Sequence, residues 1–150
     1  MTIYKHTQIG HLILTVFFVL LLVVVYSTEK NTEENILWQC LIIFTILGLL
    51  FSTLTISIHE TYLTLAFGIG IIQKKFLITD IETYSIIKTK WYYGWGIRFT
   101  PEGRLYNVSG FDAIRLQMKD GKIYLIGSDE VNKLYEILSQ IKPLSPTREN

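Results

Sequence analysis

The stretch Lys90-Trp-Tyr-Tyr-Gly-Trp-Gly-Ile-Arg-Phe-Thr-Pro-Glu-Gly-Arg-Leu-Tyr-Asn-Val-Ser-Gly110 divides the chain into two unlike parts. Its glycines and its proline predict a loop, a strand over 96–100, a tight turn and a strand over 104–108. The chain before it is rich in long apolar segments and leading strands. The chain after it has the pattern of a hairpin followed by a closing helix.

The aromatic residues of this stretch allow three interpretations. They pack in the core and its turns, or they lie at the headgroups of a bilayer, where Lys88 and Lys90 would attract anionic lipid. Alternatively, they line a groove for a peptide or another ligand. Single-stranded nucleic acid also stacks on aromatic rings, but the chain's net charge of only +1 argues against that partner.

Two apolar segments, residues 9–26 and 36–53, predict a transmembrane hairpin. Both are almost free of charge and apolar on every side, and 49% of the chain's residues are hydrophobic. A cleaved signal peptide is an alternative for the first segment, and two buried core helices are an alternative for both. Small residues at Gly48 and Ser52 have the spacing of a helix-packing motif.

The distribution of charge predicts how such a hairpin would be oriented. Lys5 precedes the first segment, and Lys74 and Lys75 follow the second, whereas the connector carries Lys30 against three glutamates, Glu29, Glu33 and Glu34. By the positive-inside rule, the sequence predicts a multi-pass protein of the cell membrane, with both termini and the β domain in the cytoplasm.

Residues 54–142 read as a β domain, and residues 143–150 as a disordered tail. Apolar residues alternate with polar ones over 54–58 and again over 62–67, which predicts two half-buried strands. Asp120-Gly121 predicts a two-residue type I′ turn between strands 113–119 and 122–127. In that register Met118 faces Ile123 and Leu116 faces Leu125, so that all four belong to the core face.

A helix closes the predicted domain. Ser128 or Asp129 is the expected N-cap, and Pro143 ends the helix. The apolar residues recur at helical spacing and form one stripe, which consists of Val131, Leu134, Tyr135, Leu138 and Ile141. The predicted fold class is therefore an α+β membrane protein: a transmembrane hairpin (residues 1–53), then an antiparallel barrel or sandwich of about seven strands with a C-terminal capping helix.

Three short motifs, 94–98 (GWGIR), 105–110 (LYNVSG) and 126–129 (IGSD), resemble those of uncharacterised bacterial membrane proteins. These proteins carry a pleckstrin-homology-like domain after two transmembrane helices. The resemblance covers about residues 54–141 and implies this fold and location, and no catalytic residue. The inositol-phosphate signature of eukaryotic relatives is not evident, because the loop between the first two strands holds His59 and Glu60.

The residues favour a non-catalytic module that presents its surface to lipid headgroups or to a membrane protein partner. The alternative is a structural or assembly subunit that acts through its helices. We expect the bilayer, a membrane protein or a second copy of the chain as partners, no nucleic acid and no cofactor or metal. No Cys/His set and no nucleophile motif indicates an enzyme. The candidate binding residues are Lys88, Lys90, Trp91, Tyr92, Arg98 and Arg104.

Overall fold

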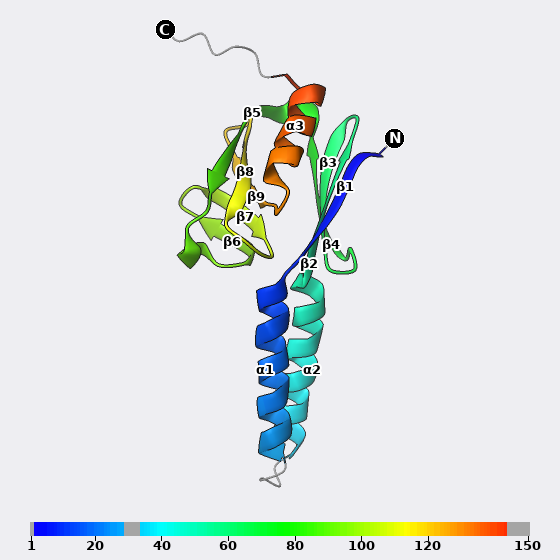
Figure 1. The fold of residues 1–150 in the computed structure, drawn as a ribbon, viewed down its shortest axis with the longest axis vertical. Helices are drawn as coiled ribbons and strands as arrows, with labels where there is room; N and C mark the ends of the chain where they lie inside the picture. The colour runs from blue at the N-terminus through cyan, green and yellow to red at the C-terminus, as the bar shows by residue number, and fades with distance from the viewer. Residues whose placement is uncertain (1, 29–33, 144–150) are drawn as a thin grey trace.

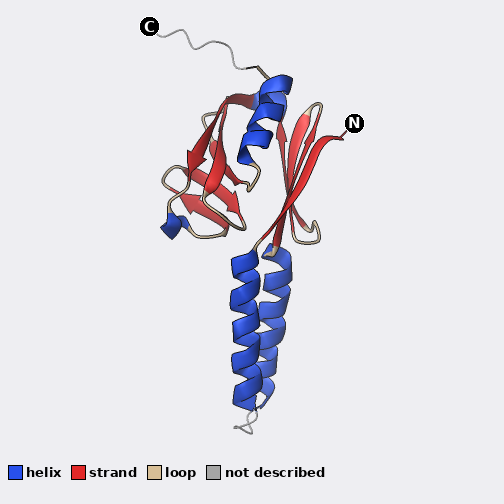
Figure 2. Ribbon diagram, viewed as in Figure 1, coloured by secondary structure: helices blue, strands red, loops and turns tan. Residues whose placement is uncertain are grey.

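Two β-sheets face each other around one core, with one helix between them at one end and a pair of long helices at the other. The computed structural model describes residues 2–28 and 34–143. Figure 1 shows the pair of helices standing beside each other below the sheets, and Figure 2 shows how they contrast with the strand-rich part. The connector between the long helices, whose charges predicted the orientation, and the predicted disordered tail lie largely outside the described residues.

The elements follow one another in the order β1 (Thr2–Ile9), α1 (His11–Thr28), α2 (Glu34–Phe51), β2 (Thr53–His59), β3 (Tyr62–Phe67), β4 (Ile72–Leu77), the 3₁₀ turn η1 (Ile78–Asp80), β5 (Ile81–Lys88), the 3₁₀ turn η2 (Trp91–Tyr93), β6 (Gly96–Thr100), β7 (Gly103–Asn107), β8 (Asp112–Met118), β9 (Ile123–Gly127) and α3 (Val131–Ile141). The first sheet has the order β1-β2-β3-β4, and the second has the order β5-β8-β9-β7-β6.

The long helices are an insertion between two paired strands. β1 runs antiparallel to β2, with Ile9 opposite Thr53. The backbone N–H of Gly10 donates to the carbonyl of Ser52 over 2.7 Å, so the chain leaves and re-enters the sheet at neighbouring points. The two helices therefore lie side by side (Figure 1). Gly48 of α2 faces Phe17 of α1, since a Cβ atom there would lie 3.3 Å from the Phe17 ring.

The main core fills the space between the sheets. In β2 and β3, apolar residues alternate with polar ones, and every second residue is buried, which confirms the predicted alternation. α3 adds Leu134 and Leu138 to this core, and both side chains are almost fully buried. Figure 1 shows α3 lying between the two sheets at the end opposite α1 and α2. The helix thus covers apolar surface that the sheets alone would leave open.

The prediction of a transmembrane hairpin is wrong. α1 and α2 each have 18 residues, which is about 27 Å at 1.5 Å per residue. α1 includes polar residues at both ends, and α2 includes them at its N-terminal end. A bilayer core of about 30 Å takes about 20 apolar residues. Within residues 2–28 and 34–143, no helix combines the length and the apolar character needed to cross a membrane. The predicted multi-pass membrane location and the predicted orientation depended on this hairpin, so they are wrong as well.

The predicted antiparallel barrel or sandwich of about seven strands needs correction in the number and direction of its strands. The described residues form nine strands in two sheets, and β7 and β9 run parallel to each other. One strand that the sequence did not predict is β1. Its partner β2 lies more than 40 residues further along the chain, so no hairpin signal marks the pair.

The hairpin of β8 and β9 has a different turn from the predicted one. The backbone N–H of Met118 donates to the Lys122 carbonyl over 2.9 Å, so the loop has three residues, Lys119 to Gly121, with Gly121 at φ +80°. The extra residue shifts the register: Leu116 lies opposite Tyr124, not Leu125. Tyr124 and Ile126 therefore face the main core, and Ile123 and Leu125 face the other side of the sheet.

α3 begins later than predicted. Its N-cap is Glu130, whose side chain makes no capping hydrogen bond. Ser128 instead accepts a hydrogen bond from the Glu130 backbone N–H over 3.1 Å and so shapes the turn that precedes the helix.

Candidate functional site

The turn η2 exposes two aromatic side chains because it is anchored by a third. Tyr93 is buried on the outer face of the second sheet, against Leu105 and Leu125. Its hydroxyl donates to Glu102 over 2.9 Å. Trp91 and Tyr92 point away from this anchor and are 77% and 59% exposed. The side chains of the turn are therefore divided between packing and a free surface.

Two lysines flank these exposed rings. Lys88 is exposed at the end of β5, and the Lys90 ammonium lies 5.9 Å from the ring of Tyr92 and 3.6 Å from a carboxylate oxygen of Glu102. The neighbouring Tyr92 side chain is the main cause that raises the pKa of Lys90, with smaller contributions from Tyr93 and Glu102. Lys88, Lys90, Trp91 and Tyr92 are called the aromatic patch below.

The other two candidate residues lie on the β6–β7 hairpin. Arg98 is exposed, and its Nε donates to the backbone carbonyl of Trp95 over 2.9 Å. The Arg104 guanidinium lies 4.4 Å from the centre of the Phe99 ring. The six predicted residues thus do not form one site, because four make up the aromatic patch and two line cavities.

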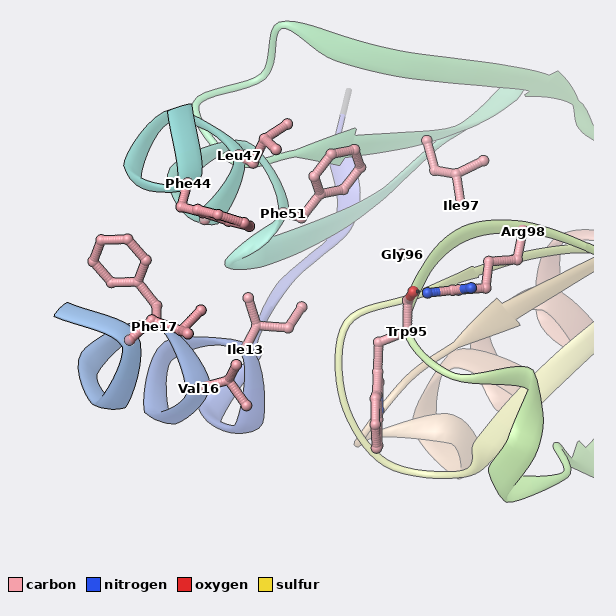
Figure 3. Close-up of a pocket in the computed structure, with 12 residues that line it drawn as sticks. Ile13, Val16, Phe17, Phe44, Leu47, Phe51, Trp95, Gly96, Ile97 and Arg98 are labelled. Carbon is pink, nitrogen blue, oxygen red and sulfur yellow. Dashed lines mark hydrogen bonds between the residues drawn. The ribbon is translucent and has the colours of Figure 1, made fainter. Parts of the chain in front are cut away.

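The larger cavity is an apolar groove of about 470 Å³ between the helix pair and the start of β6. Figure 3 shows Ile13 and Val16 on one side of it and Trp95 on the other. Arg98 also lines the groove, and its guanidinium points toward the Trp95 backbone (Figure 3). The indole N–H of Trp95 is buried and has no hydrogen-bond acceptor among the described residues.

A second cavity of about 210 Å³ lies where β3 and β4 approach β6 and β7. Its polar lining comes from Gln73, Lys74, Arg104 and Tyr106. Burial is the main cause that raises the pKa of Tyr106, against the opposing effect of the Arg104 charge. Sequence reasoning found Arg104 and missed Lys74, because the residues of this cavity come from two hairpins, β3–β4 and β6–β7, which β5 and η2 separate in the chain.

A third cluster joins β1 to the start of α3, and sequence reasoning missed it. The His6 ring lies 2.6 Å from Asp129 and 3.4 Å from Glu130. The Tyr4 hydroxyl donates to Glu130 over 3.1 Å, and burial is the first cause that raises the pKa of Tyr4. More than 120 residues separate the partners, so no local spacing could have indicated them. Within the described part of the chain, no group of three or more His, Cys, Asp or Glu could hold a metal.

Comparison with known proteins assigns no family to this chain. No family model matches the sequence, and a search of curated proteins finds no match. The predicted resemblance to pleckstrin-homology-like domains therefore stays a prediction.

Proposed function

We propose that this protein is a non-catalytic binding module that presents the aromatic patch to anionic lipid headgroups. The observation that carries the proposal is the exposure of Trp91 and Tyr92 beside Lys88 and Lys90. Trp and Tyr favour the headgroup level of a bilayer, where one end of the ring stays wet and the other is apolar. Lysines near an anionic surface add an attraction that salt screens.

Co-sedimentation of the full chain with vesicles tests this function. We expect binding to phosphatidylserine vesicles that weakens as salt is raised, and much weaker binding to phosphatidylcholine vesicles. The double variant Lys88→Glu and Lys90→Glu should lower the affinity for the anionic vesicles at least about tenfold, because two attractions become repulsions.

A matched variant separates local contact from net charge. Lys119→Glu with Lys122→Glu makes the same change of charge at the hairpin, at the opposite end of β8 from Lys88. It should retain most of the binding. Equal losses in both double variants, or no binding by the folded protein, would show that the patch does not recognise anionic lipid and would favour a protein partner.

A second candidate function is assembly through α1 and α2, and exposed apolar surface favours it. Large apolar side chains stay about half exposed or more on both helices, among them Phe18 and Val23 of α1 and Ile43 and Leu49 of α2. A surface of this kind marks an interaction site. Gly48 already packs against Phe17 within the chain, so an interface between copies would use these larger side chains instead.

Light scattering of the purified chain tests the assembly. We expect a defined oligomer, and we expect Phe18→Glu with Ile43→Glu to shift it toward monomers, because charge at a buried interface is costly. A monomer at all protein concentrations would contradict this candidate function.

A further inference from the structure

The apolar groove and the second cavity adjoin each other. Ile97 lines both of them. The Phe51 ring of the groove lies 5.9 Å from the Phe67 ring of the second cavity, in an edge-on arrangement. Ile97 and these two rings therefore form a common boundary between the groove and the second cavity.

The two halves differ sharply in chemistry. The groove is lined almost wholly by apolar side chains, from Ile13, Val16 and Phe17 of α1 and from Phe44, Leu47 and Phe51 of α2. The second cavity brings together Lys74 and Arg104, with the amide of Gln73 beside them. No carboxylate of the described residues lines either cavity. The groove is thus apolar apart from Arg98, whose Nε donates to the Trp95 carbonyl, whereas the second cavity carries two cations.

The two cations lack acidic partners. Neither Lys74 nor Arg104 forms an ion pair with a carboxylate of the described residues. The Lys74 ammonium lies near aromatic rings, 5.8 Å from the centre of Phe76 and 6.0 Å from that of Tyr124. Arg104 Nε is buried and has no acceptor among the described residues. A buried donor of this kind gains from an anionic acceptor, which forms the stronger class of hydrogen bond.

We propose that the groove and the second cavity together bind one anionic single-chain amphiphile. Its alkyl chain would lie between α1, α2 and Trp95, and its anionic head between Lys74 and Arg104. The groove, at about 470 Å³, has the size of ordinary small-molecule sites, which are mostly apolar with a few polar groups that fix orientation. This site uses none of the residues of the aromatic patch, so binding of the amphiphile and binding to vesicles can each be present or absent without the other.

Calorimetric titration of the full chain with octyl phosphate, below its critical micelle concentration, tests the proposal. Octanol and inorganic phosphate are the two partial probes, one lacking the charge and the other lacking the chain. We expect octyl phosphate to bind at least about tenfold more tightly than either probe, because only it occupies both halves. Equal affinity for octanol would overturn the anionic half, and equal affinity for inorganic phosphate would overturn the apolar half.

Matched variants place the site. Lys74→Gln with Arg104→Gln should lower the affinity for octyl phosphate at least about tenfold, whereas Lys75→Gln, on the same strand but outside the lining, should leave it within about twofold. Val16→Trp should block the groove. Val19→Trp should not, although Val16 and Val19 are 50% and 52% exposed on the same helix.

Circular dichroism would show that each variant is folded before its affinity is compared. Equal losses in Lys75→Gln or Val19→Trp would show diffuse attraction to the surface and would overturn the assignment.

Discussion

At the scale of single residues, Asn107 shows how one buried amide joins β7 to β1 and packs against the end of β9. Its side chain is 1% exposed. Its amide donates to the Gly110 carbonyl over 3.0 Å, and its oxygen accepts from the Ser109 backbone N–H over 3.2 Å. The Gln8 amide of β1 donates to the Ser109 carbonyl over 2.6 Å and lies 3.4 Å from the side-chain oxygen of Asn107. Gly127, at the end of β9, leaves the room that the Asn107 side chain fills.

We expect Gly127→Ala to destabilise the protein by about 1–3 kcal/mol, because the new methyl group would overlap the Asn107 side chain. The hydrogen bonds that Asn107 makes to the turn at 109–110 hold it in place, so it has little freedom to yield. The free energy of unfolding, measured by urea denaturation, gives the cost directly.

The double variant Gly127→Ala with Asn107→Ala identifies the cause. Asn107→Ala alone should also destabilise the protein, since it removes the partner of buried polar groups. If the overlap is the cause, the double variant should cost less than the sum of the two single changes, because the clashing amide is gone. Strict additivity would show that Gly127 is required for another reason.

At the scale of elements, local patterns predicted the strands that bury every second side chain. β2 and β3 alternate regularly because one face lies on the core. β1 gave no such signal, since only Tyr4 and Gln8 of its eight residues are buried and its isoleucines are exposed. A strand whose apolar residues point outward is recognised only through its partner, and β2 lies beyond the two long helices.

The β8–β9 hairpin shows how one extra loop residue can exchange the buried and exposed faces of a strand whose position was predicted correctly. The sequence placed both strands, but it did not show whether the loop at Asp120-Gly121 has two residues or three. The side chain of Asp120 accepts a hydrogen bond from the Lys122 backbone N–H over 3.1 Å, which supports the longer loop. The residues of β9 that face the main core are therefore Tyr124 and Ile126, whereas the predicted register had placed Ile123 and Leu125 there.

The candidate site could be predicted only where its residues are neighbours in sequence. The aromatic patch spans five consecutive positions, 88–92, so composition alone indicated it. The anchor that exposes it, Tyr93, was not distinguishable from Tyr92 without the register of the sheet beneath. The second cavity could not be predicted without the tertiary structure, because Lys74 and Arg104 meet only after the two sheets have packed against each other. Spacing along the chain carries no signal for such a meeting.

At the scale of the whole molecule, buried tyrosines connect the elements. The Tyr84 hydroxyl donates to the Lys142 carbonyl over 2.8 Å and so joins β5 to the end of α3. Tyr4 joins β1 to Glu130, and Tyr106 lies in the core against Phe67 and Phe76. Burial is the main cause that raises the pKa of each of these three hydroxyls above the ordinary value of 10.0.

Alkaline pH should therefore destabilise the protein. Above about pH 10 these tyrosines ionise in the unfolded chain while the folded protein keeps them protonated, so the free energy of unfolding falls as pH rises. Each contributes at most about 1.4 kcal/mol per pH unit. Lys142 acts in the opposite sense, because burial lowers its pKa. Urea midpoints between about pH 8 and 11 measure the net effect, and Tyr84→Phe should make the decline shallower by removing one of the groups that cause it. An unchanged slope in that variant would mean that Tyr84 ionises at the same pH whether the chain is folded or unfolded.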